Sequence, residues 1–318
     1  MRVLHLSDTT LSGAPGNLAR LWNKYSGDVG RHMVWNRIPP EQKWRIFPVD
    51  LVGSEMDRQE VVDEIARADI LHFHNRYLRQ KCFFNDPSIW KIAQRKPCVI
   101  QMQSPRGSED FTQELASTRP ISVVAQYQVR EWPEAEYIVP NVVDIFDPAY
   151  MPRERTQLHE TPVVCYSPSN FNATGRDDKG YGYTAKLMKQ MAIDHQIKSQ
   201  IITSRPHADV MTLKRCADIG IDEIATGSYH MSSLEFLSLG VACIASIDHL
   251  TFRAINKITG VGHIPWVVAE RHTLATELRR IINHHEYKVK GLESREWMEK
   301  YWQPRRLCQI YREMYEAL

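Results

Sequence analysis

The sequence has no long apolar run, no closely paired cysteines and almost no net charge. None of its apolar runs approaches the roughly 20 residues that a membrane-spanning helix needs. The six cysteines are scattered without a CxxC spacing, which favours reduced, buried thiols over a disulfide framework. A formal net charge of +2 gives no bulk attraction to nucleic acid or anionic lipid. With no signal-peptide pattern before the first apolar run, we expect a cytoplasmic protein.

A length of 318 residues is large for one core and suits two domains of roughly 150 residues. In both halves, short apolar runs alternate with amphipathic stretches, a pattern typical of parallel sheets covered by helices on both faces. The predicted strands are Val3–Leu6, Val29–Trp35, Ile70–Phe73, Val99–Met102, Ile121–Ala125, Tyr137–Val139, Val163–Tyr166, Gln200–Thr203, Ile219–Ile224, Ala242–Ser246 and His263–Val268. We therefore predict an α/β protein with domains over 1–143 and 144–302, joined at a linker that begins with Pro140–Asp144, and a C-terminal helix over 303–318.

The segment from Ala217 to Ser246 reads as strand, tight loop, helix and strand. The helix starts at Met231 with two serines, and a helix N-terminus offers free backbone N–H groups to an anion. Glu235 follows about one turn further in, where it can accept hydrogen bonds from a sugar diol. Phosphate on the amides and ribose on the carboxylate is the arrangement that a nucleotide-sugar site requires. An ordinary βαβ unit with serine capping is the alternative.

Two loops that precede helices also indicate ligand contacts. The first strand leads into Ser12–Gly16, whose glycines allow close backbone approach, although the spacing is not the GxGxxG of a dinucleotide site. Lys179 stands at a helix start, where the helix dipole disfavours a cation. A lysine there indicates a bound anion, unless it is solvated and balanced by the neighbouring Asp177 and Asp178.

Polar residues end two strands of the first half. His72 and His74 fall on one strand face, but the sequence shows no third ligand, so we predict histidines that are satisfied within the fold or line a cleft, and no metal. Gln103 and Ser104 end another strand, and Arg106 is suited to a phosphate or carboxylate.

Together these segments resemble the retaining glycosyltransferases of the GT-B fold, of the family-4 type. The matching segments are Leu4–Ser7 with Ser12–Ala14, Asp69–Asn75, the hinge Tyr137–Asp144, Lys179–Gly180, and Glu235 with Leu239–Ser246. The resemblance implies two Rossmann-like domains that face a central cleft, with the C-terminal helix crossing back to the first domain.

The resemblance also implies roles for individual residues. The expected catalytic residues are Lys179, Arg176, His74 and Gln103. The expected donor-binding residues are Gly13, Ser169, Asn170, Lys179, Tyr229, His230, Met231, Ser232, Ser233 and Glu235. The expected acceptor-binding residues are Ser12, Gly13, Asn75, Ser104 and Arg106. No acidic DxD pair ends a strand, so we expect neither a metal nor another cofactor, and the nucleotide sugar is a substrate.

The sequence departs from the family pattern in the hinge, where Val142 replaces the usual glycine, and at three places in the expected site. Gly227 stands where the family has a glutamate that contacts the donor sugar, which leaves backbone amides and Tyr229 or His230 as substitutes. The usual arginine before the lysine loop is absent, and Arg176 is the nearest replacement. A histidine that often ends the fourth strand is Gln103 here.

The function predicted from these features is transfer of a hexose or pentose from a nucleotide sugar with retention of configuration. A non-catalytic nucleotide-sugar-binding protein of the same fold is one alternative. A nucleotide-sugar epimerase is another, although the carboxylate pair that it would need is not evident.

The acceptor is less well defined. A basic and partly aromatic stretch lies in the first domain, and a solvated helical face is its simplest interpretation. If functional, it could meet a membrane surface and a lipid-linked glycan, or nucleic acid with a modified base as acceptor; a free glycan is the third option. Its charged residues are Arg76, Arg79, Lys81, Lys91, Arg95 and Lys96.

Overall fold

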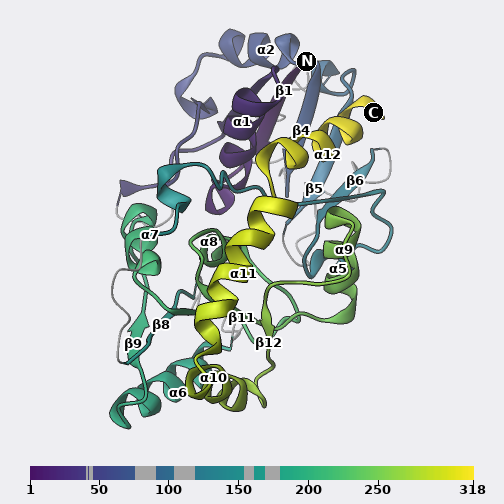
Figure 1. Cartoon of the computed structure of the whole chain (residues 1–318). Helices are drawn as coiled ribbons and strands as arrows, with labels where there is room; N and C mark the ends of the chain where they lie inside the picture. The colour runs from purple at the N-terminus through teal and green to yellow at the C-terminus, as the bar shows by residue number, and fades with distance from the viewer. Residues whose placement is uncertain (41, 43–45, 76–90, 104–118, 154–160, 169–179) are drawn as a thin grey trace. The chain divides into compact units, whose positions relative to one another are not determined.

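The computed structural model describes the chain except residues 41, 43–45, 76–90, 104–118, 154–160 and 169–179. It divides into two compact units (Figure 1). Unit 1 consists of Met1–Val142 together with Pro304–Leu318, and unit 2 is Val143–Gln303. The division after Val142 falls inside the segment predicted as the linker.

Unit 1 is built on a parallel sheet of seven strands. These are β1 (Arg2–Ser7), β2 (Val29–Val34), β3 (Leu51–Val52), β4 (Ile70–His74), β5 (Cys98–Met102), β6 (Ile121–Val124) and β7 (Tyr137–Val139). Their order is β3-β2-β1-β4-β5-β6-β7, so β1 lies between β2 and β4. The helices are α1 (Ala14–Tyr25), α2 (Arg58–Arg67), α5 (Gln128–Glu131) and α12 (Pro304–Glu316), with short 3-10 turns η1 (Leu11–Gly13) and η3 (Gly53–Glu55).

Unit 2 is built on a parallel sheet of five strands. These are β8 (Val163–Tyr166), β9 (Lys198–Ile201), β10 (Ile219–Ile221), β11 (Ala242–Ala245) and β12 (Val267–Val268), in the order β12-β11-β10-β8-β9. The helices are α6 (Tyr181–Ile193), α7 (His207–Arg215), α8 (Met231–Ser238), α9 (His249–Thr259), α10 (Leu274–Asn283) and α11 (Glu286–Tyr301), with a 3-10 turn η5 (Pro148–Tyr150). The central strands β10 and β11 are fully buried, and β8 is buried except at Val163, because helices cover both faces of the sheet.

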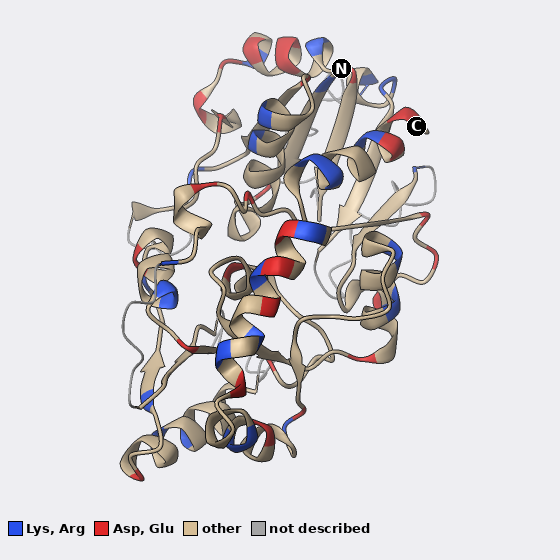
Figure 2. Ribbon diagram, viewed as in Figure 1, with Lys and Arg blue, Asp and Glu red and all other residues tan. Residues whose placement is uncertain are grey.

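The helix α11 packs against α8 and β11 and carries charges of both signs along its outer side (Figure 2). One exposed pair on it joins Lys290 to Glu293 at 2.6 Å. An exposed pair of this kind contributes at most about 1 kcal/mol, so packing on the sheet, and not this surface pair, fixes α11. Within the described part of the chain, no helix combines the length and the apolar character needed to cross a membrane.

The helix α12 belongs to unit 1 although all of unit 2 precedes it in the chain. The Tyr311 hydroxyl donates to the carbonyl oxygen of Pro140 at 2.8 Å, and the Tyr315 hydroxyl lies 2.7 Å from His72 Nδ1. The Tyr315 ring meets Trp22 of α1 edge-on, with ring centroids 5.2 Å apart. The predicted C-terminal helix therefore covers buried polar groups of the first sheet.

Gly220 of β10 lies directly beneath the helix α8. A Cβ atom at this position would stand 2.4 Å from the ring of Phe236. We expect Gly220→Ala to lower the free energy of unfolding of unit 2 by about 1–3 kcal/mol, since overpacking a close-packed core displaces the side chains around it. Urea denaturation measures this, with Gly262→Ala as control because no atom lies within 4 Å of a Cβ there. Equal midpoints for the two variants would contradict the close packing.

Candidate functional site

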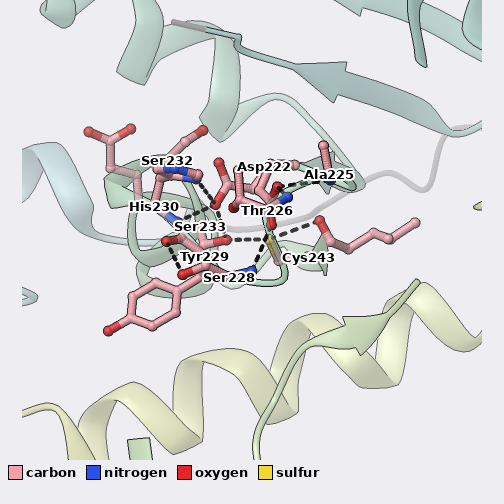
Figure 3. A network of polar contacts seen from close by, with 12 residues as sticks. Asp222, Ala225, Thr226, Ser228, Tyr229, His230, Ser232, Ser233 and Cys243 are labelled. Atoms are coloured by element: carbon pink, nitrogen blue, oxygen red, sulfur yellow. Dashed lines mark hydrogen bonds and ion pairs between the residues drawn. The ribbon is translucent and has the colours of Figure 1, made fainter. Parts of the chain in front are cut away.

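Two buried carboxylates follow β10 and hold the loop that leads into α8 (Figure 3). The carboxylate of Glu223 accepts hydrogen bonds from the backbone N–H groups of Ala225 at 2.9 Å, Thr226 at 2.6 Å and Ser228 at 2.9 Å. One side chain thus satisfies three backbone donors that the turn removes from regular pairing. The loop conformation is therefore set from inside the unit.

The second carboxylate, Asp222, fixes the start of α8. It accepts from the backbone N–H of His230 at 2.5 Å and from the hydroxyl of Ser233 at 2.7 Å. His230 is the N-cap residue, and its side chain makes no capping hydrogen bond. The hydroxyl of Ser232 accepts from Lys214 at 2.7 Å. Both serines of the first turn, Ser232 and Ser233, thus contact side chains outside α8. An ordinary βαβ unit whose serines only cap the helix would not need these contacts.

Glu235 lies on α8 with only 6% of its surface exposed. Lys214 Nζ donates to Oε2, and His207 Nε2 lies 2.7 Å from Oε1. Burial alone would raise the pKa of Glu235, but Lys214 and His207 outweigh it and lower the pKa to about 2. Glu235 is therefore ionised at neutral pH. A carboxylate offers roughly four lone-pair positions, so this pairing leaves acceptor capacity for a ligand.

Sequence reasoning missed Lys214 and His207, the two partners of Glu235. Both come from α7, the helix that precedes α8 in the chain, which packs against it. A signal for Lys214 does exist. It follows Met211 by three residues on the buried side of α7, so a lysine occupies an apolar helical position. A buried lysine requires a carboxylate partner.

Tyr229 was predicted to contact the donor sugar, and the structure corrects this for its side chain. The ring is fully buried, with its centroid 5.0 Å from that of Trp266 and 6.4 Å from that of Trp302. The anchored loop turns the ring into the core of unit 2. Gly227 has φ +69°, a left-handed conformation that is strained for a side chain such as glutamate. This backbone geometry is a physical reason for glycine where the family has glutamate.

The loop expected to carry the phosphate-binding lysine is described only at its end. Lys179, Arg176, Ser169 and Asn170 lie outside the described residues. Gly180, which follows Lys179, is the N-cap of α6, and a Cβ atom on it would stand 2.5 Å from the Ile224 side chain. The start of α6 therefore touches the loop that follows β10.

In unit 1, Gln103 follows β5 and is held by several hydrogen bonds. Its side-chain nitrogen lies 3.1 Å from His74 Nδ1, and its backbone N–H donates to Asn75 Oδ1 at 2.6 Å. Its carbonyl oxygen accepts from Gln128 Nε2 at 2.7 Å. The structure thus brings together three predicted residues, His74, Asn75 and Gln103. Ser104 and Arg106, which follow, lie outside the described residues.

The first loop of unit 1 is a tight turn around Ser12 and Gly13. Gly13 has φ +81° and is the N-cap of α1, and its backbone N–H donates to Thr10 O at 2.7 Å. A Cβ atom on Gly13 would stand 2.6 Å from the ring of Phe47. The sequence predicted that a ligand would lie close to the Gly13 backbone. In the structure the Phe47 ring takes this position.

A third histidine, which the sequence pattern did not show, lies beside the predicted pair. His5 of β1 is in register with His72, and its Nδ1 lies 3.0 Å from His74 Nε2. Burial lowers the pKa of His72 to about 3, and burial with the neighbouring histidines holds those of His5 and His74 well below the usual range. The His72 and His74 rings stack, with centroids 4.1 Å apart and an interplanar angle of 21°. One ring nitrogen from each of the three histidines lies within 4.8 Å of the others, so this group could hold a metal ion, and His5 is the third ligand that the sequence pattern did not show.

The predicted basic stretch is only partly described. Arg76, Arg79 and Lys81 lie outside the described residues. Lys96 donates to the carbonyl oxygens of Ala66 at 2.6 Å and Ala68 at 2.7 Å, so it stabilises the end of α2. Lys96 therefore has a structural role in unit 1.

No protein-family model matches the chain, and no curated protein sequence does. Solved structures do match over its full length. An alpha-glucosyltransferase in complex with UDP-glucose and DNA containing an abasic site has a TM-score of 0.72 and 10% identity, covering 100% of this chain and 98% of its own. HepE of Anabaena in complex with UDP and glucose has a TM-score of 0.61 and 15% identity, with 100% of both chains covered.

Sucrose-phosphate synthase of Thermosynechococcus elongatus also matches, with a TM-score of 0.61, 12% identity and 100% of both chains covered. At these identities the likeness concerns the fold. It confirms the predicted α/β architecture of the GT-B glycosyltransferases.

Proposed function

We propose that this chain is a glycosyltransferase that moves a hexose or pentose from a nucleoside diphosphate sugar to an acceptor, with retention of configuration. The observation that carries the proposal is the ionised carboxylate of Glu235, one turn inside a helix whose N-terminus follows an anchored loop. The fold matches proteins that were solved with UDP or UDP-glucose.

In the proposed reaction, departure of the nucleoside diphosphate develops negative charge that preorganised donors must stabilise. The backbone amides at the start of α8, around Met231–Ser233, would meet the phosphates, together with Lys179 and Arg176. Glu235 would accept hydrogen bonds from the ribose hydroxyls and so fix the donor.

We propose that the reaction needs no metal ion. Asp222 and Glu223 are the acidic pair at the end of β10, and backbone N–H groups already occupy both oxygens of Glu223 and Oδ2 of Asp222. Charge stabilisation would then come from the protein's own donors. Activity that survives EDTA unchanged would agree with this, and activity restored only by Mg²⁺ would contradict it.

The proposed acceptor side lies in unit 1, with Gln103, His74 and Asn75 as its described polar groups. A glycan, a lipid-linked glycan and a modified nucleic-acid base are the acceptor classes. The neighbour solved with DNA makes DNA with a modified base the first acceptor to test.

Incubation with a panel of nucleotide sugars tests the proposal. We expect release of a nucleoside diphosphate that depends on one donor and increases when the correct acceptor is present. Neither release nor binding across the panel would contradict the proposal. Binding without release would favour a non-catalytic nucleotide-sugar-binding protein, an alternative that the glycine in place of glutamate at position 227 keeps open.

Glu235→Ala is expected to weaken nucleotide binding by roughly tenfold or more, because it removes charge-assisted hydrogen bonds to the ribose. Calorimetric titration with the nucleoside diphosphate measures the loss. The control is Glu293→Ala on α11, which removes an exposed pair and should leave affinity unchanged. Equal affinities of the two variants would remove Glu235 from the site.

A further inference from the structure

We propose that Lys214 and His207 are positioning residues that orient the Glu235 carboxylate for recognition of the ribose diol of a nucleotide. The inference rests on the proposed function and adds two residues that act through a third. Each of them holds a different carboxylate oxygen.

Lys214 holds Glu235 from the interior. It is only 1% exposed, and its ammonium group lies 4.6 Å from the centre of the Phe236 ring. It donates to Ser232 Oγ and to Glu235 Oε2 at once. One cation therefore joins the first turn of α8 to the carboxylate, so the amides proposed for phosphate and the carboxylate proposed for ribose share one anchor.

His207 holds the other oxygen from the outer side. Its side chain is 29% exposed, and it is the first residue of α7, while Lys214 lies in the last turn of the same helix. His207, at the start of α7, thus contacts Oε1, and Lys214, in its last turn, contacts Oε2. The carboxylate plane is fixed before a ligand arrives, which reduces the entropy lost on binding.

The charge of Glu235 depends on this arrangement. Among the residues that the structure describes, the titratable groups that face it are Lys214 and His207 of α7 and the Cys165 thiol of β8, whose pKa burial raises to about 12. Burial opposes ionisation, so without Lys214 the pKa of Glu235 rises. A protonated carboxyl group loses acceptor capacity and accepts weaker hydrogen bonds than a carboxylate does. Recognition of the diol would then depend on pH.

Titration of UDP and 2′-deoxy-UDP between pH 5 and 8 tests the inference. We expect the wild-type chain to prefer the ribose form by roughly tenfold at every pH, because Glu235 stays ionised. In Lys214→Met the preference should disappear at pH 5 and return in part at pH 8. A purely structural role would weaken both nucleotides equally and leave the ratio unchanged. Lys189→Met, on the exposed side of α6, is the matched control and should behave as wild type.

A second variant keeps the test decisive if Lys214→Met does not fold. Lys214→Met/Glu235→Gln removes both charges, and replacement of a whole buried pair is tolerated far better than removal of one partner. It should bind both nucleotides equally at every pH. A ribose preference of wild-type size and pH behaviour in the single or the double variant would overturn the inference. A wild-type chain that binds UDP without preferring ribose would also overturn it and leave the proposed function standing, whereas no binding of either nucleotide would overturn both.

His207→Ala separates the two positioning residues. Oε1 then loses its partner while Lys214 still keeps Glu235 ionised, so the ribose preference should fall several-fold with no new pH dependence. An unchanged preference would remove His207 from the inference.

Discussion

Glu223→Ala is expected to lower the free energy of unfolding of unit 2 by about 3 kcal/mol or more. The substitution leaves three backbone N–H groups of the loop after β10 without their acceptor, and each unsatisfied buried donor costs about 1–3 kcal/mol. Because this loop leads into α8, nucleotide binding should fall together with stability. Urea denaturation and calorimetric titration measure the two effects.

Glu223→Gln provides the graded comparison. Its single amide oxygen can still accept from the N–H groups of Ala225 and Thr226, while its NH₂ group faces the N–H of Ser228. Its loss of stability should lie between those of the wild type and the alanine variant. An alanine variant as stable as Glu293→Ala, an exposed change on α11, would show that the carboxylate does not hold the loop.

The second large effect is acid destabilisation of unit 1. Burial lowers the pKa values of His32 and His72 to about 3 and keeps those of His5 and His74 well below their usual range. In the unfolded chain each titrates near pH 6.5, so below that pH the unfolded state binds more protons than the folded state. Stability is therefore retained above about pH 6.5 and is lost as the pH falls toward 3. Each histidine can change the free energy of unfolding by up to about 1.4 kcal/mol per pH unit in this range.

Chemical denaturation between pH 8 and pH 5 measures this linkage. The slope of the free energy of unfolding against pH reports the number of protons taken up on unfolding. We expect His72→Gln to lower that number by about one, because one buried neutral imidazole has been removed. His272→Gln is the control, since that side chain is 75% exposed on unit 2. If the two variants and the wild type share one slope, the buried histidines are not the source of the acid sensitivity.

The sequence allowed the sheets and the strand ends to be predicted because apolar periodicity is a local property. The strands β4, β8 and β11 lie where the apolar runs placed them. The strand β9 begins at Lys198, two residues before the predicted run, because it lies at the edge of its sheet and three of its four residues, Lys198, Ser199 and Gln200, are polar. The two-residue β3 has too short a pattern to detect.

The side-chain partners could not be predicted, because they depend on which strands and helices become neighbours. His5 joins His72 only because β1 lies between β2 and β4 in the sheet. Lys214 joins Glu235 only because α7 packs on α8. Tyr229 was expected to contact the donor because it lies beside Gly227, which stands where the resembled family has a donor-contacting glutamate. Its direction follows from the carboxylate that anchors the loop.

The position of α12 has a consequence for the order of events on the ribosome. Unit 2 is continuous in sequence, so all of it is synthesised before α12 is made. Until then the nascent N-terminal segment lacks the Tyr311 and Tyr315 hydroxyls that meet the Pro140 carbonyl and His72. Although domains generally fold in the order of their synthesis, here the second unit can reach its native state first. We expect the first unit to complete its core only when α12 brings the Tyr315 hydroxyl to His72.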